Sequence, residues 1–140
     1  MDHLKNLVKR VLSDSAFHRL KSWNQTMRNK VFAAQKITEM RYGDFVLAIP
    51  QNHLLLSFRD TQEYRDRNLA MTAKFLGEKY PEAQIVDIGA NIGDTAALMA
   101  TQVRNPLVLI EASDYFFELL QKNALQFPNK VNLLKVLIGD

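Results

Sequence analysis

The stretch from Gln84 to Leu98, QIVDIGANIGDTAAL, constrains the fold of this chain more than any other segment. A short apolar run leads into an acid, Asp87, then into two glycines that frame an asparagine, and then into a series of small residues. The apolar run is too short for a helix, and glycine permits the positive φ angles of a tight loop. This order predicts a buried parallel strand, a ligand-binding loop and a helix that begins at about Thr95.

Two properties of the loop predict ligand binding. Gly89 and Gly93 lack a Cβ, so the backbone at these positions can lie close to a ligand. The free N–H groups that open the following helix favour an anionic group such as a phosphate or a carboxylate. The alternative is a Rossmann-like turn that holds no ligand.

The glycine spacing argues against a dinucleotide. The dinucleotide fingerprint has glycine at its first, third and sixth positions, which here are Gly89, Asn91 and Asp94. Only the first position matches, and Asp94 near the helix start would repel a pyrophosphate. A domain that binds NAD or a flavin dinucleotide is therefore disfavoured, and stabilisation by NAD would be its signature.

The segment VDIGANIGDTA, residues 86–96, resembles motif I of the class I S-adenosylmethionine-dependent methyltransferases, specifically that of the FkbM family. The resemblance implies that the acid at Asp87 lies near the methionine ammonium and that the loop surrounds the methionine end. It also implies an acid after the second strand that binds the ribose hydroxyls. Glu111 directly follows the apolar run LVLI and fits this position, and a carboxylate can accept two hydrogen bonds from a ribose diol.

The cofactor that the resemblance implies is S-adenosyl-L-methionine (SAM), with O-methyl transfer to a hydroxyl of a sugar or another small molecule. Asp140 follows the third strand, where the resemblance implies a contact with the adenine. No residue is assigned as the catalytic base, and no metal site is predicted. The residues predicted to bind SAM are Asp87, Gly89, Asn91, Gly93, Asp94, Thr95, Glu111, Ala112 and Asp140.

The predicted fold class is α/β. Three apolar runs, at 85–88, 107–110 and 131–138, are the expected strands of a Rossmann-like parallel sheet with the order β-α-β-α-β along the chain. Right-handed crossovers then give the strand order 3-2-1. The strand at 85–88 is expected to present an unpaired apolar edge, which invites association.

Three helices are expected around this sheet. The first has apolar residues at helical spacing from Leu69 to Tyr80 and ends before Pro81. The second follows the glycine loop, and its alanines predict close packing. The third begins at Ser113 or Asp114 as the N-cap.

Two further apolar runs, Phe45 to Ile49 and Leu54 to Phe58, precede the sheet and predict a β-hairpin. The residues between them, 50–53, form the expected turn. His53 in this turn is expected to be a solvated loop residue, because no second histidine or carboxylate lies nearby at the spacing of a metal site.

The chain is divided by charge. Residues 1–41 contain nine Lys and Arg against three Asp and Glu, a balance of +6, whereas residues 42–140 have a balance of −3. Apolar residues recur at helical spacing from Leu4 to Leu12. We predict a basic helical segment at 1–41 that packs on the body or on a second subunit, with an anionic membrane surface as the alternative. Residues 42–140 are predicted to hold the hairpin and an incomplete SAM-binding domain.

The composition excludes several kinds of site and partner. The 140 residues include no cysteine, which excludes disulfides, thiolate zinc sites and a cysteine nucleophile. No apolar run reaches membrane-spanning length, the first residues lack the apolar core of a signal peptide, and no nucleic-acid motif is present. A cytoplasmic protein is expected.

The pattern of strands ends where the first half of a class I methyltransferase would end. We therefore expect an N-terminal, cofactor-binding portion of a longer methyltransferase that is inactive alone, or one part of a split protein completed by a partner chain. The alternative is a non-catalytic fragment or interaction module that keeps half of a Rossmann-like fold and forms homo-oligomers.

Overall fold

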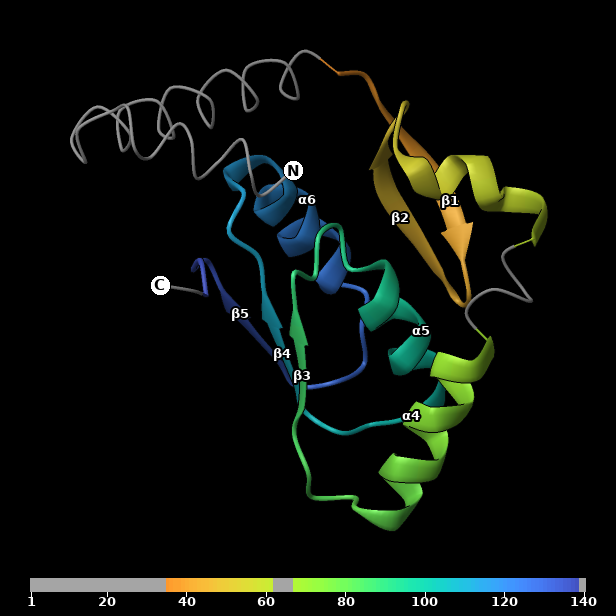
Figure 1. Cartoon of the computed structure of the whole chain (residues 1–140), viewed down its shortest axis with the longest axis vertical. Helices are drawn as coiled ribbons and strands as arrows, with labels where there is room; N and C mark the ends of the chain where they lie inside the picture. Colours follow the sequence, from red (N-terminus) through yellow and green to blue (C-terminus); the bar gives the residue numbers. More distant parts are fainter. Residues whose placement is uncertain (1–34, 62–66, 139–140) are drawn as a thin grey trace, which may run out of the picture. The chain divides into compact units, whose positions relative to one another are not determined.

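In the computed structural model, residues 35–61 and 67–138 are described. They form an antiparallel hairpin and a parallel sheet with helices between its strands (Figure 1). The predicted α/β class is confirmed. The predicted basic segment lies outside the described residues up to position 34, and so does Asp140.

The parallel sheet has the strand order β3-β4-β5, which is the predicted order. Its strands are β3 (Ile85–Ile88), β4 (Leu107–Ile110) and β5 (Val131–Leu134). Leu107 and Leu109 of the central strand are fully buried. The third strand is shorter than predicted and ends at Leu134, because its partner β4 ends at Ile110 and the ladder has no further residues to pair.

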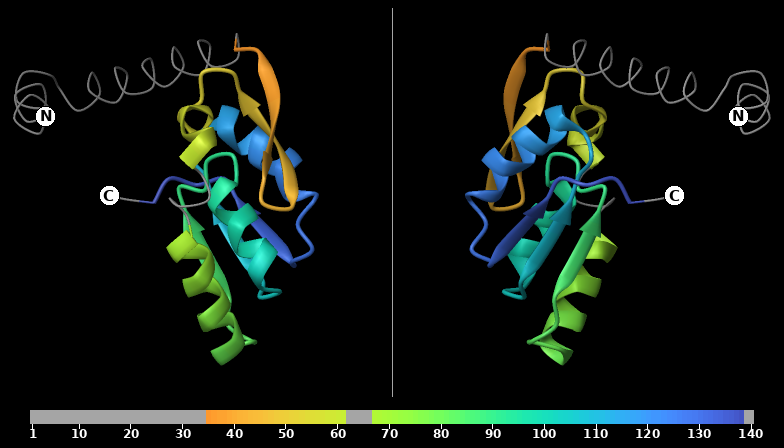
Figure 2. Two further views of the ribbon diagram at one scale, coloured as in Figure 1. Left: turned by 90° about the vertical axis from the view of Figure 1, so that its right-hand side faces the viewer. Right: turned by 90° about the vertical axis from the view of Figure 1, so that its left-hand side faces the viewer.

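Three helices accompany this sheet: α4 (Arg67–Lys79), α5 (Asp94–Gln102) and α6 (Asp114–Ala124). Helix α4 packs against α5, whose buried alanines allow close approach. Of the two predicted N-caps, Ser113 and Asp114, the structure has Ser113 at the N-cap of α6, and its side chain accepts a hydrogen bond from the Phe116 N–H group. The views in Figure 2 place the helices on one face of the sheet, and the strands lie in front in its right-hand panel.

The hairpin is formed by β1 (Ile37–Tyr42) and β2 (Phe45–Pro50). The predicted pairing of 45–49 with 54–58 is therefore wrong. Gly43 and Asp44 form the turn, and Gly43 has a φ of 58°, which glycine adopts at little cost. Strand β1 also takes up residues 37–41, which were predicted to belong to the helical segment.

The second apolar run of the predicted hairpin is a 3-10 helix, η1 (Leu54–Thr61). The Ser57 hydroxyl donates to the Leu54 carbonyl at 2.6 Å, a local bond that a strand would not form. The chain therefore turns after β2 and continues in a tight helix instead of returning along the strand.

Amide side chains from the end of α6 pair with the outer edge of β2. Asn123 accepts a hydrogen bond from the Ala48 N–H group at 2.7 Å and donates to the Ala48 carbonyl at 3.1 Å. Gln126 makes the same pair of bonds with Val46, at 3.1 and 2.8 Å. Each amide carries a donor and an acceptor, as a peptide group does. The hairpin is thus fixed against α6, with the exit of β2 close to the loop after β3.

Candidate ligand site at the carboxyl ends of β3 and β4

The loop that follows β3 and the residues that follow β4 meet at one edge of the parallel sheet (Figure 1). In open α/β sheets, ligands bind at this carboxyl edge. Asp87 lies on β3, and Glu111 directly follows β4. All the residues predicted to bind SAM lie in the described part except Asp140, whose predicted adenine contact stays a prediction.

Glu111 connects the two loops. One carboxylate oxygen, Oε2, accepts a hydrogen bond from the Asn91 N–H group at 3.0 Å, and the other, Oε1, accepts one from the Ser113 N–H group at 2.7 Å. The first donor belongs to the loop after β3 and the second to the turn before α6. A carboxylate has about four acceptor positions, so these two bonds leave acceptor capacity for a ribose diol.

The backbone N–H groups of the loop 89–93 are all used inside the protein. Gly89 and Ala90 both donate to the Ile110 carbonyl, at 2.8 and 2.9 Å, and Gly93 donates to Ala90 at 2.7 Å. The N–H groups of residues 91 and 92 donate to side chains. Phosphate-binding loops direct such groups at the ligand. The loop is therefore held by its own bonds and offers these five groups to no anion.

The two glycines of the loop have different surroundings. A Cβ at Gly89 would have no heavy atom within 4 Å, and its φ is 82°. A Cβ at Gly93 would meet the Leu120 side chain at 2.9 Å. Gly93 therefore packs against α6 and acts as the left-handed N-cap of α5, whereas Gly89 faces open space. Of the two glycines, only Gly89 is placed where a ligand can approach the backbone.

Asn91 is the only non-glycine residue of the described chain with a positive φ, 50°. This left-handed conformation costs most L-residues about 1–2 kcal/mol, and asparagine tolerates it because its side chain bonds locally. Its Oδ1 accepts from the Ile92 N–H group at 2.9 Å and lies 3.1 Å from Nε2 of His53. The side chain of Asn91 thus fixes the middle of the loop.

His53 is not the solvated loop residue that the sequence predicted. Its Nδ1 accepts a hydrogen bond from the Leu55 N–H group at 3.3 Å. With Nδ1 as an acceptor, the arrangement places a ring proton on Nε2, which donates to Asn91. The ring also lies edge-on to Phe116, with 6.1 Å between the centroids. Local residue spacing could not have identified His53 as part of the site, because its contact with Asn91 joins positions 38 apart in sequence.

Asp87 carries the clearest electrostatic feature of the site. Its Oδ2 atom is buried and has no hydrogen-bond partner in the structure. Burial raises the pKa of this carboxyl group above its ordinary value of 3.8, and the negative charges of Asp94 and Glu111 raise the pKa further. A positively charged ligand group beside Asp87 would offset both effects.

The remaining predicted residues line the start of two helices. Asp94 and Thr95 form the first turn of α5, and Ala112 lies between Glu111 and the N-cap of α6. All three are partly exposed. Within 35–61 and 67–138, no three His, Asp or Glu residues are grouped closely enough to hold a metal ion.

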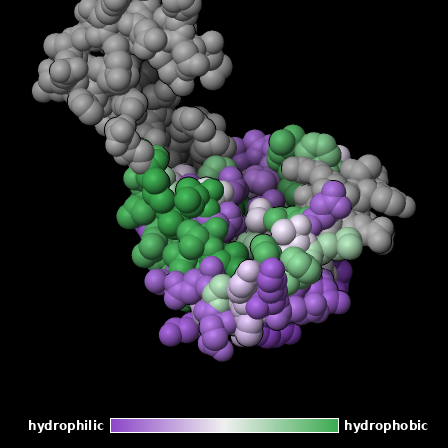
Figure 3. Space-filling view, turned by 60° about the horizontal axis from the view of Figure 1, so that its bottom comes forward, coloured by the Kyte–Doolittle hydropathy of each residue, from purple (hydrophilic) through white to green (hydrophobic). Residues whose placement is uncertain are grey.

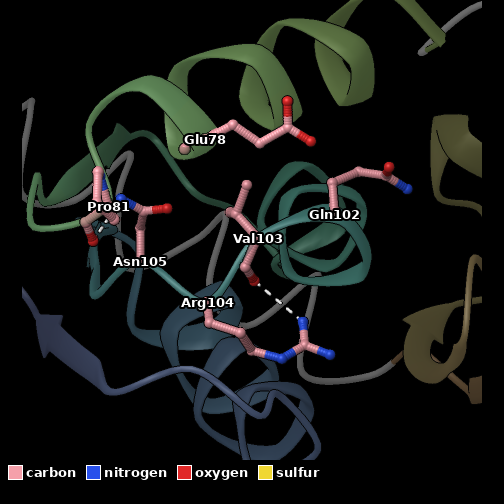
Figure 4. A pocket seen from close by; sticks show the side chains of 7 residues that line it. Glu78, Pro81, Gln102, Val103, Arg104 and Asn105 are labelled. Atoms are coloured by element: carbon pink, nitrogen blue, oxygen red, sulfur yellow. Dashed lines mark hydrogen bonds between the residues drawn. The ribbon is translucent and has the colours of Figure 1, made fainter.

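A pocket of about 250 Å³ lies at the opposite end of the sheet, between the ends of α4 and α5 (Figure 4). Its lining includes Glu78, Arg104 and Asn105 and contains no residue predicted to bind SAM. The Arg104 guanidinium bends back to the carbonyls of Ala100 and Val103, at 2.8 and 3.1 Å. The Arg104 guanidinium thus caps carbonyls at the C-terminal end of α5 and is not directed into the pocket as a ligand-binding group. We therefore assign the pocket no role in ligand binding.

Comparison of the chain with models of protein families gives no match, and a search of curated proteins finds no sequence of significant similarity. Within the described ranges, each helix falls short of the length and apolar character needed to cross a bilayer.

Proposed function

We propose that the carboxyl edge of β3 and β4 binds SAM and that the chain is the cofactor-binding portion of a methyltransferase. The observation that carries this proposal is the buried, unpartnered Oδ2 atom of Asp87. A buried carboxylate oxygen without a partner is unfavourable, and a ligand ammonium would give this oxygen a partner. SAM carries an ammonium and a sulfonium, both positive.

The charge of the surrounding groups supports a cationic ligand over an anionic one. Asp87 lies within electrostatic reach of Asp94 and Glu111, and the N–H groups of the loop 89–93 are already used. A pyrophosphate would therefore meet negative charge and find no free donors in this loop. This is a stronger argument against a dinucleotide than the glycine spacing alone.

Glu111 supports the ribose contact in this proposal. Its two bonds to backbone N–H groups hold the carboxylate in one orientation, so the remaining acceptor positions are fixed before a ligand arrives. Such preorganisation lowers the entropic cost of binding. The resemblance to FkbM-like proteins extends the proposal to O-methyl transfer onto a small-molecule hydroxyl, for which the described residues supply no assigned base.

Calorimetric titration with S-adenosylhomocysteine, 5′-methylthioadenosine and NAD tests the proposal. Methylthioadenosine shares the adenosine and the sulfur but lacks the amino-acid end. Asp87→Asn should weaken S-adenosylhomocysteine about tenfold or more, because it removes a charged partner of the ammonium, and should leave methylthioadenosine unchanged.

Glu111→Gln is the matched comparison because it changes a carboxylate to an amide at the ribose position, and it should weaken both adenosine ligands. An equal effect of Asp87→Asn on both ligands would contradict the assignment of Asp87. Preference for NAD over S-adenosylhomocysteine would contradict the proposal as a whole.

An interaction module is the second candidate, and it is favoured by the face of the sheet that no helix of residues 67–138 covers (Figure 2). Val86 and Ile88 on the edge strand β3 are 54% and 65% exposed. Figure 3 shows hydrophobic side chains gathered over part of the surface. Parallel sheets are usually covered on both faces. Multi-angle light scattering of the wild type and of Ile88→Lys tests this candidate, which predicts an oligomer that the charged variant dissociates.

A further inference from the structure

We infer that His53 is a positioning residue for the proposed cofactor site, because its Nε2–H group holds Asn91 in the left-handed conformation of the loop. The bond joins the exit of the hairpin to the glycine-rich loop at 3.1 Å. The effect on a ligand rests on the proposed function, whereas the effect on the loop itself does not.

Asn91 is the residue through which His53 acts on the loop. Its Oδ1 atom accepts from both His53 and the Ile92 N–H group, and its own N–H group donates to Glu111. A change in the backbone conformation of Asn91 would therefore break the bond to Glu111 and displace the carboxylate proposed to bind the ribose. One donated bond from His53 supports both the loop and the acid.

The fold holds the His53 ring firmly. The His53 N–H group donates to the Pro50 carbonyl at 2.9 Å, which sets the turn after β2. Phe116 of α6 packs edge-on against the ring at 73°. Strand β2 is itself held by Asn123, whose Nδ2 group also donates to the Ile92 carbonyl at 2.8 Å. The loop is thus held at two consecutive residues, Asn91 by His53 after the hairpin and Ile92 by Asn123 of α6.

The geometry assigns His53 to positioning and not to proton transfer. Its Nδ1 lone pair is taken by the Leu55 N–H group, and its Nε2 proton is directed at Asn91. A general base needs a free lone pair within reach of the substrate proton. In this arrangement both ring nitrogens are occupied inside the protein.

Two substitutions separate the donated bond from the bulk of the ring. His53→Phe keeps an aromatic ring against Phe116 and removes the donor, whereas His53→Gln keeps an N–H donor without the ring. We expect His53→Phe to weaken S-adenosylhomocysteine about tenfold, which corresponds to the loss of one hydrogen bond at a fixed loop. His53→Gln should stay close to wild type.

Hydrogen exchange by NMR provides a measurement without ligand. In His53→Phe the amide protons of Asn91 and Ile92 should exchange faster, and His53→Gln should restore much of their protection. The ¹⁵N shifts of the His53 ring should show the proton on Nε2. A ring with its proton on Nδ1 would overturn the inference, because Nε2 of His53 would then have no proton to donate to Asn91.

A double-mutant cycle with Asn91→Gly tests the route of the effect. Glycine adopts a positive φ without help from a side chain. The substitution His53→Phe should therefore weaken S-adenosylhomocysteine when Asn91 is present and should have little effect in the Asn91→Gly background. Equal losses of affinity in the two backgrounds would overturn the inference.

The two proposals can fail separately. If wild-type protein does not bind S-adenosylhomocysteine, the proposed function fails, and the exchange rates still decide the role of His53. If it binds and His53→Phe changes neither the affinity nor the exchange of Asn91 and Ile92, only the positioning role is overturned.

Discussion

The two ends of the parallel sheet are both closed by side chains that bond to backbone groups, but with opposite chemistry. At the amino end, the Asn105 amide donates to the carbonyls of Tyr80, Pro81 and Ala83, at 2.9, 3.2 and 2.9 Å. At the carboxyl end, the Glu111 carboxylate accepts from two backbone N–H groups. One end uses a neutral donor and the other a charged acceptor.

The difference separates an end held by neutral amides from the end at which we propose that the ligand binds. Asn105 is only 5% exposed, and Asn129 donates to its carbonyl at 2.9 Å, so this end is a network of neutral amides in which, among the described residues, the one buried oxygen without a partner, Oδ1 of Asn129, carries no formal charge. The carboxyl end keeps partly buried carboxylates together and leaves Oδ2 of Asp87 without a partner. Raised carboxyl pKa values such as that of Asp87 are common at functional sites, and the proposed ligand would supply the missing positive charge.

Asn105→Ala should have the largest effect on stability. It removes a side chain that is only 5% exposed and leaves three backbone carbonyls without their donor, so we expect a loss of about 3 kcal/mol in the free energy of unfolding, measured by urea denaturation. Gln102→Ala at an exposed neighbouring position is the control and should change stability by less than about 0.5 kcal/mol. Equal effects of the two variants would contradict the structural role of Asn105.

Glu111→Ala should lower stability by a smaller amount, about 2 kcal/mol, because two backbone N–H groups lose a partly exposed charged acceptor. The loss should be accompanied by faster hydrogen exchange at Asn91 and Ser113, the two donors. Unchanged exchange at both amides would mean that Glu111 does not hold the loops together.

In contrast to these two substitutions, Asp87→Asn should raise the free energy of unfolding. It removes a charge that burial and two neighbouring acids disfavour, so the free energy of unfolding should rise by about 0.5 kcal/mol, a modest gain because solvent screens a partly exposed group. Together with weaker binding of S-adenosylhomocysteine, this gain would show that the carboxyl end gives up stability for binding. A loss of stability would break the contrast between the two ends.

The gain in stability that we expect from Asp87→Asn should depend on pH. The pKa of Asp87 is raised in the folded protein, so the folded state binds more protons than the unfolded state between 3.8 and the raised value. The contribution of Asp87 to stability therefore falls as pH rises through this window. The wild type and the variant should be equally stable below the window and differ above it, as thermal unfolding across pH would reveal.

Much of the sheet was predictable from sequence because its signals are local. Runs such as LVLI at 107–110 are too short and too apolar for an exposed helix, and Ser113 carries a cap signature that its own neighbours satisfy. The hairpin was mispredicted although its signal was present. The strand-like runs 37–42 and 45–50 are separated only by Gly43 and Asp44. A two-residue turn of this kind favours a hairpin more strongly than the longer separation at 50–53 does.

The candidate site was only partly predictable. The positions of Asp87 and Glu111 follow from the strands that precede them, because carboxyl ends of adjacent parallel strands share an edge. The opposite environments of Gly89 and Gly93 do not follow, because packing of Gly93 on Leu120 depends on where α6 lies. The involvement of His53 depends in turn on how α6 holds the hairpin.

By itself the sequence determined the α/β class, the strand order and the edge of the sheet at which the loop and the two acids meet. These properties depend on periodicity, glycine and crossover handedness, all of which act over short stretches of chain. Only the tertiary structure decided which groups of that edge are already bonded and which are left open. Hydrogen bonds between His53, Asn91 and Glu111 join residues from three separate segments, and such pairings exist only once the elements have packed.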